Sequence, residues 1–144
     1  MKGVLRGALL LLEETLTAGV RVACYRRRMN DLDTLLGRRS PAVAILAHEV
    51  IDWLAGQYPE MTGKVKLGWG TVNFHHPRAG FVVAVYPSGD HVSVIYQRGR
   101  MLSSPLLVGG KDIKQVRWIP LAPGEPVPWD EIGLLLVEAI ALAG

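Results

Sequence analysis

Cysteine is almost absent from this sequence, since Cys24 is the single one among 144 residues. One thiol cannot form a disulfide within the chain, and structural disulfides are typical of oxidising compartments. Long apolar runs are also missing, because no stretch approaches the roughly 20 apolar residues that a membrane-spanning helix needs. The sequence therefore predicts a cytoplasmic protein without a membrane span, in which Cys24 serves as small apolar filler.

A strong excess of positive charge is missing from the part of the chain that we expect to fold. The whole sequence holds 16 basic and 13 acidic residues, a net charge of +3. Residues 1–28 hold six of the basic and two of the acidic residues, which leaves 29–144 with a net charge of −1. Binding to nucleic acid depends on an extended basic surface. We therefore expect no nucleic-acid partner.

Residues 1–28 predict a helix, because apolar side chains recur at helical spacing, namely Leu5, Leu9, Leu12, Leu16 and Val20. Glu13 and Glu14 interrupt the apolar stretch where a signal peptide must stay apolar. Three interpretations are open. The segment could be a helix packed on the domain or on a second copy, or an interfacial helix whose Arg26–Arg28 cluster meets acidic lipid. In the third, Met29 is the true first residue and the upstream stretch results from a wrong start assignment. The change in charge balance at residue 29 favours the third. We treat 1–28 as a helical extension and 29–144 as one domain.

Two helices are expected within this domain. Ser40 followed by Pro41 supplies an N-cap and a proline at the first helical position. Apolar residues at helical spacing follow from Val43 to Tyr58, and the helix is expected to end between residues 56 and 59. A second helix is predicted from the pattern over residues 132–143, which is apolar enough to be mostly buried.

Between the helices the apolar period changes from helical spacing to two. Residues 81–86 and 91–96 flank the turn-forming sequence Pro87-Ser88-Gly89-Asp90 and predict a β-hairpin. Further strands are expected near residues 72–76, 101–102 and 113–119. The sequence thus predicts an α+β fold of two layers, an antiparallel meander sheet of about five strands with the N- and C-terminal helices packed on one face.

A hairpin register with Tyr86 opposite His91 separates two faces of this sheet, and a slip by one residue would mix them. The apolar core face then holds Phe81, Val83, Val85, Val92, Val94 and Tyr96, together with Val72, Phe74, Val116 and Trp118. The other face, called the open face below, holds Val82, Ala84, Tyr86, His91, Ser93 and Ile95, together with Asn73, His75, Gln115 and Arg117.

The open face carries the candidate ligand site, which consists of Tyr86, His91, Ser93 and Arg117, bordered by Trp69. An aromatic ring, a titratable imidazole, a hydroxyl and a fixed cation suit a small anionic or aromatic ligand, with Arg117 binding a carboxylate or phosphate. Two other interpretations are open. Antiparallel sheets often expose one half-polar face to water, and a homodimer could cover the apolar side chains that remain.

Three motifs that are typical of catalytic sites are incomplete or absent in this sequence. The segment 48–52 lacks the second histidine of a zinc-protease HExxH motif, since Asp52 occupies that place. Gly109-Gly110-Lys111 lacks the upstream glycine and the following Ser or Thr of a phosphate-binding P-loop. A Gly-x-Ser-x-Gly nucleophile elbow is absent. We therefore predict a non-catalytic domain with no cofactor, no metal site and no catalytic residue.

Several motifs in a fixed order resemble the YdhG-like family of domains of unknown function. They are Gly68-Trp69-Gly70 followed by Phe74, Gly80-Phe81, the strand over 91–96, the segments 98–102 and 105–111, Gln115-Val116-Arg117, and a closing helix over 129–141. The resemblance covers residues 30–143 and implies a frataxin-like fold, and some members of the family are described as iron chaperones.

This resemblance adds an alternative function, that of a frataxin-like iron-binding chaperone. Frataxins use an acidic ridge on the first helix, whereas the first domain helix here offers Glu49 and Asp52 alone. That departure weighs against iron binding, and no metal ligand is carried over. A third alternative is an enzyme of unknown reaction type that uses His91 and Arg117.

Overall fold

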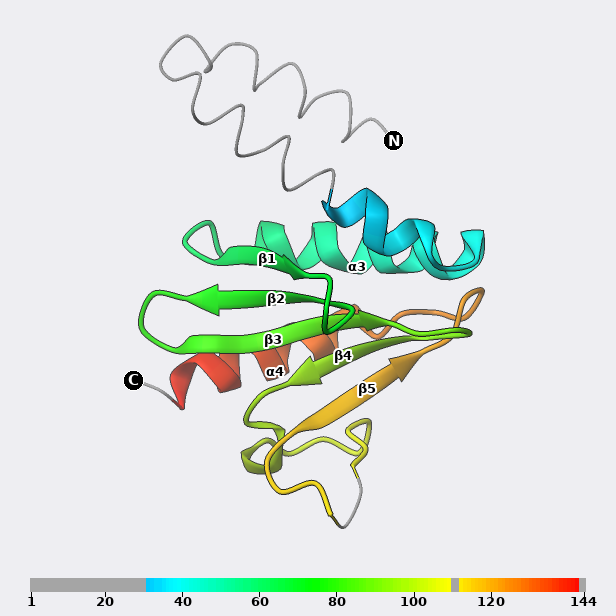
Figure 1. The fold of residues 1–144 in the computed structure, drawn as a ribbon. Helices are drawn as coiled ribbons and strands as arrows, with labels where there is room; N and C mark the ends of the chain where they lie inside the picture. Colours follow the sequence, from blue (N-terminus) through cyan, green and yellow to red (C-terminus); the bar gives the residue numbers. More distant parts are fainter. Residues whose placement is uncertain (1–30, 110–111, 143–144) are drawn as a thin grey trace, which may run out of the picture.

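The computed structural model describes residues 31–109 and 112–142. The helix predicted over residues 1–28, Cys24 and the proposed boundary at Met29 lie outside these residues. The described chain forms a single sheet with helices behind it (Figure 1).

The sheet is an antiparallel meander of five strands in the order β1-β2-β3-β4-β5. The strands are β1 (Thr62–Lys66), β2 (Thr71–His76), β3 (Gly80–Pro87), β4 (Val92–Tyr96) and β5 (Arg117–Leu121). The predicted strand number and topology are confirmed. The strand predicted at 101–102 is wrong, because that segment forms a short 3-10 helix, η2 (Gly99–Met101), and β1 supplies the fifth strand.

The helices supply the second layer. Residues 31–37 are helical and precede α3 (Pro41–Gln57), while α4 (Trp129–Ala141) closes the domain. Ser40 caps α3 as predicted, since its Oγ accepts a hydrogen bond from the Val43 amide at 3.3 Å. The buried side chains of all three helical segments join those of the strands in one core cluster, and Figure 1 shows α3 and α4 behind the sheet. The α+β fold with helices on one face is confirmed.

The hairpin register differs from the prediction by two residues, since the partner of Tyr86 is Ser93 and not His91. Tyr86 pairs with Ser93 and Pro87 with Val92, so the turn consists of residues 88–91. The turn closes there because the Ser88 amide donates to the His91 carbonyl at 2.8 Å. The loop keeps its four residues and the alternation is unchanged. The core positions predicted for Val83, Val85, Val92, Val94 and Tyr96 are therefore confirmed.

A β-bulge changes the faces at the start of β3. The β2–β3 register shifts between Phe74, which pairs with Val83, and His75, which pairs with Phe81. The bulge leaves Val82 as the extra residue, buried in the core, while Phe81 stacks on His75 with 5.3 Å between the ring centres. The predictions that Phe81 faces the core and Val82 the open face are therefore wrong.

The last strand also has the opposite alternation to the one predicted. Tyr96 pairs with Arg117 and Ile95 with Trp118, so Trp118 lies on the open face and Arg117 on the side of Tyr96. Buried Ile119 and Leu121 are the residues of β5 that enter the core. The predicted core position of Trp118 and the predicted open-face position of Arg117 are wrong. The cause is the long connection from β4, whose path sets the start of β5 independently of the hairpin. Val116, predicted in the core, precedes β5 and is half-buried.

Candidate functional site

Two rows of side chains run across the open face from β1 to β5. The first row is Lys64, Asn73, Ala84, Ile95 and Trp118, each paired with the next. The second row begins with Lys66 and Thr71 and ends with Tyr86, Ser93 and Pro120. The face is therefore cationic at the β1 edge, polar in its middle and more apolar at β5.

The middle of this face is polar and yet buried. Asn73 is 1% exposed and Ser93 is 4% exposed. The hydroxyl of Thr71, also buried, donates to the Asn73 side-chain carbonyl at 2.8 Å. The described helices pack on the opposite face and belong to the core cluster. The result is a fixed set of polar groups in a partly dry setting, where hydrogen bonds are stronger than in water.

Three of the five predicted site residues come together. Tyr86 and Ser93 are direct cross-strand partners. Trp69, 65% exposed, lies in the turn between β1 and β2. The next residue, Gly70, has φ of +73°, and a Cβ built there would lie 3.5 Å from Cε1 of Tyr86. This turn therefore packs against Tyr86, and Trp69 lies in it with an exposed ring.

His91 occupies the β3–β4 turn at the end of the face. Its Nδ1 lies 2.9 Å from Oγ of Ser88 and 2.7 Å from Oδ1 of Asp90. The hydrogen bond from His91 holds the pKa of the Asp90 carboxyl below its usual value. The imidazole is thus oriented by its own turn, and no described residue of the polar rows hydrogen-bonds to it.

Arg117 does not join this group. Its Nη1 donates to the carbonyls of Ile113 at 2.9 Å and Val116 at 2.7 Å, and its side chain packs against Gly99 and Gly109. The guanidinium therefore holds the connection between β4 and β5 instead of facing a ligand beside Tyr86. The pairing of His91 with Arg117 that the enzyme alternative requires is not formed.

The cations that do lie on the open face are Lys64 and Lys66, which the sequence analysis missed. Their period-two alternation with Val65 is the signal that points to them. Glycine and lysine are depleted in strands, which hides β1 from a propensity argument. With Lys64 and Lys66, the face has the positive charge that the prediction assigned to Arg117.

His75 lies on the same face, opposite Thr62 of β1. Burial lowers the pKa of its imidazole, and the positive charges of Lys64 and then Lys66 lower it further. Its Nδ1 is buried and has no hydrogen-bond partner within the described residues. His75 is therefore held as a neutral ring stacked on Phe81, beside the row that begins with Lys64.

The described residues show no sign of a metal centre. His48 and Asp52 form the expected i,i+4 pair at 3.0 Å on the surface of α3. No group of three or more His, Cys, Asp or Glu side chains capable of holding a metal ion occurs within 31–109 and 112–142. None of the helices in these ranges is long and apolar enough to cross a membrane.

Comparison with known proteins supports the fold. The chain resembles the crystal structure of YdhG from Bacillus subtilis, a protein of the DUF1801 family, with a TM-score of 0.54 and 21% sequence identity over 78% of this chain and 86% of that chain. No family model and no curated protein matches the sequence. The fold is therefore similar to that of a DUF1801 protein, as the resemblance in the sequence implies.

Proposed function

We propose that this chain is a non-catalytic binding domain of the YdhG-like type whose open face binds a small ligand with an anionic group and an aromatic or apolar part. One observation carries the proposal: the rows across the face place Lys64 and Lys66 beside buried Asn73 and Thr71, and the same face carries Tyr86 one strand further on. The described helices pack on the other side of the sheet, and the side chains of Lys64, Lys66 and Trp69 are exposed. Ligand sites commonly combine an apolar surface with a few fixed polar groups.

The parts of the face match the parts of such a ligand. The two ammonium groups attract a carboxylate or phosphate at the β1 edge. Tyr86 and the exposed ring of Trp69 offer aromatic surface for stacking. Buried Asn73 and Ser93 lie beneath them and form the fixed polar base of the face. Lys66, which lies in the same row as Tyr86, takes the role of anion-binding cation that the sequence analysis assigned to Arg117.

A thermal-shift screen of metabolites tests the proposal, followed by titration of any hit. Lys66→Gln should weaken binding of the hit about tenfold, the usual effect of one charge-assisted contact. The matched control is Arg38→Gln, which removes one exposed positive charge from the segment before α3, away from the open face. Equal weakening by both variants would show non-specific attraction and contradict the proposal, as would a hit that Lys66→Gln leaves unchanged.

Self-association is a second candidate function, favoured by the half-buried side chains of Ile95 and Trp118 and by exposed Trp69. A homodimer that used this face would bury them. Light scattering with size-exclusion chromatography distinguishes the two, because Ile95→Lys should convert a dimer to a monomer and leave a monomer unchanged. A cytoplasmic location stays a prediction, which fractionation of cells would test.

An iron-handling function receives no support from the described residues. α3 offers Glu49 and Asp52 as its acidic side chains, and Asp52 is paired with His48. Anaerobic titration with ferrous iron is expected to show no saturable uptake. Stoichiometric binding would restore the iron-chaperone alternative and displace the small-ligand proposal.

A further inference from the structure

The connection between β4 and β5 concentrates positive charge in a domain that is otherwise acidic. In the sequence, residues 98–117 hold five basic residues and one acidic residue. The remainder of 29–144 holds five basic and ten acidic residues. A local excess of one sign in a concave place raises the concentration of oppositely charged ligands there.

This connection is folded around a hollow. Arg98, Arg100, Met101 and Gln115 line a cavity of about 410 Å³ that opens to solvent. The Arg100 amide donates to the Gln115 carbonyl at 2.8 Å, which joins the two sides of the connection behind it. Arg117 holds the same segment through the carbonyls of Ile113 and Val116. The hollow therefore has a backbone fixed by hydrogen bonds and a volume typical of small-molecule sites.

The two arginines that line the hollow are not used by the fold. Within the described residues, every ion pair has a histidine as its basic member, so no carboxylate neutralises Arg98 or Arg100. Neither guanidinium makes a hydrogen bond to a described residue, although each carries five donors. These donors are available to an oxyanion, which guanidinium groups bind in bidentate fashion.

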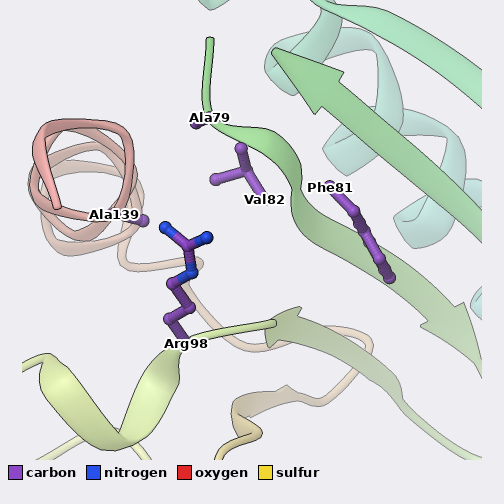
Figure 2. A pocket seen from close by; sticks show the side chains of 5 residues that line it. All are labelled: Ala79, Phe81, Val82, Arg98 and Ala139. Carbon is purple, nitrogen blue, oxygen red and sulfur yellow. The ribbon is translucent and has the colours of Figure 1, made fainter. Parts of the chain in front are cut away.

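Arg98 lies between this hollow and a second crevice. Figure 2 shows its guanidinium directed toward Ala139 of α4 and Val82 of β3, with Ala79 beyond them. Apolar side chains of this kind accept no hydrogen bond. Because the Arg98 guanidinium makes no hydrogen bond in the crevice, its rotation toward an anion in the hollow breaks none.

We infer that this hollow is a second ligand site, separate from the open face, which binds a small molecule carrying a phosphate monoester. Arg100 and Arg98 bind the phosphate oxygens, the Gln115 amide donates to a further oxygen, and exposed Met101 contacts the organic part of the ligand. A small phosphate monoester fits better than nucleic acid, because the hollow is confined and the surrounding domain is acidic.

Titration of the full chain with phenyl phosphate, followed by NMR, tests the inference. The side-chain signals of Arg98, Arg100, Gln115 and Met101 should shift together and reach saturation. Arg100→Gln should weaken the affinity about tenfold, and it leaves the backbone bond from Arg100 to Gln115 in place. Inorganic phosphate should bind the same site more weakly, because it lacks a group for Met101. An unchanged backbone spectrum of the variant shows that it still folds.

The control variant is Lys66→Gln, which removes one exposed charge from the open face. It should leave the saturating shifts of Arg98, Arg100, Gln115 and Met101 unchanged, even where phenyl phosphate also binds the open face. Arg100→Gln in turn leaves binding at the open face unchanged, so the two proposals fail separately. Three outcomes would overturn this inference: no saturable shift at these four side chains, equal weakening of those shifts by both variants, or shifts confined to the open face. A titration with benzoate and with a duplex oligonucleotide extends the test, because tighter binding of either at these four side chains would contradict the phosphate monoester.

Discussion

The phenol of Tyr96 in β4 donates a hydrogen bond to the backbone carbonyl of Ile132 in α4 at 2.9 Å. Both residues are fully buried, and their sequence positions are 36 apart. Burial raises the pKa of this phenol well above its ordinary value, so the hydroxyl stays protonated and remains a donor. The bond therefore joins the centre of the sheet to the first turn of the closing helix.

Tyr96→Phe should lower the free energy of unfolding by about 1 kcal/mol, since it removes this bond and leaves a buried carbonyl with one partner fewer. Urea denaturation followed by tryptophan fluorescence measures the change. Tyr86→Phe is the matched control, because the Tyr86 hydroxyl has no hydrogen-bond partner within the described residues. Equal losses for the two variants would contradict the importance of the Tyr96 bond.

Gly99→Ala should destabilise the domain by about 1–3 kcal/mol, the usual effect of overpacking. A Cβ at this position would contact Cβ of Arg117 and would lie 2.7 Å from its backbone nitrogen, which cannot move without disturbing β5. Gly89→Ala provides the comparison, because a Cβ there meets nothing within 4 Å. The thermal midpoint of Gly99→Ala should fall while that of Gly89→Ala stays near the unsubstituted value.

Arg117→Gln should loosen the connection between β4 and β5 without affecting ligand binding on the open face. The substitution removes the bonds to the carbonyls of Ile113 and Val116, and hydrogen bonds to a charged group contribute about 1.5–3 kcal/mol each. Hydrogen exchange should accelerate at the amides of Val108 and Trp118, which bond to each other's carbonyls. Unchanged exchange there would show that Arg117 does not hold this segment.

Stability should depend on pH through His75. Its pKa lies below the ordinary 6.5 in the folded state, so the unfolded chain binds more protons between the two values. Stability is therefore complete above 6.5 and falls as the pH drops from there toward the folded-state pKa. Urea midpoints between about pH 5 and pH 7.5 measure this dependence.

His75→Gln should flatten that pH profile, and the difference between the two profiles isolates His75 from the other histidines. Lys64→Gln should flatten it in part, because one of the charges that lower the His75 pKa is removed. A profile that His75→Gln leaves unchanged would contradict the assignment.

Patterns of short range in the sequence determined much of the fold. The Ser40-Pro41 pair and the helical spacing after Val43 predict α3, because capping and amphipathic periodicity act within one or two turns. The hairpin of β3 and β4 follows from alternation around a turn-forming sequence. For the same reason the core positions of Val83, Val85 and Val94 are predicted correctly, since a register error of two residues preserves their alternation.

The tertiary structure alone decided the composition of the candidate site. A β-bulge cannot be predicted from the alternation of apolar residues. The reversed faces of Phe81 and Val82 therefore follow only from the β2–β3 pairing. The alternation in one strand also does not predict which residues of the next strand face the core when a long connection separates the two. Arg117 and Trp118 therefore lie on the faces opposite to those predicted. Lys64 and Lys66 reach the open face because β1 pairs with β2, a long-range contact that local propensity opposes. The sequence determines which chemical groups are present. Which of these groups lie together in a site depends on strand register, which only the folded sheet fixes.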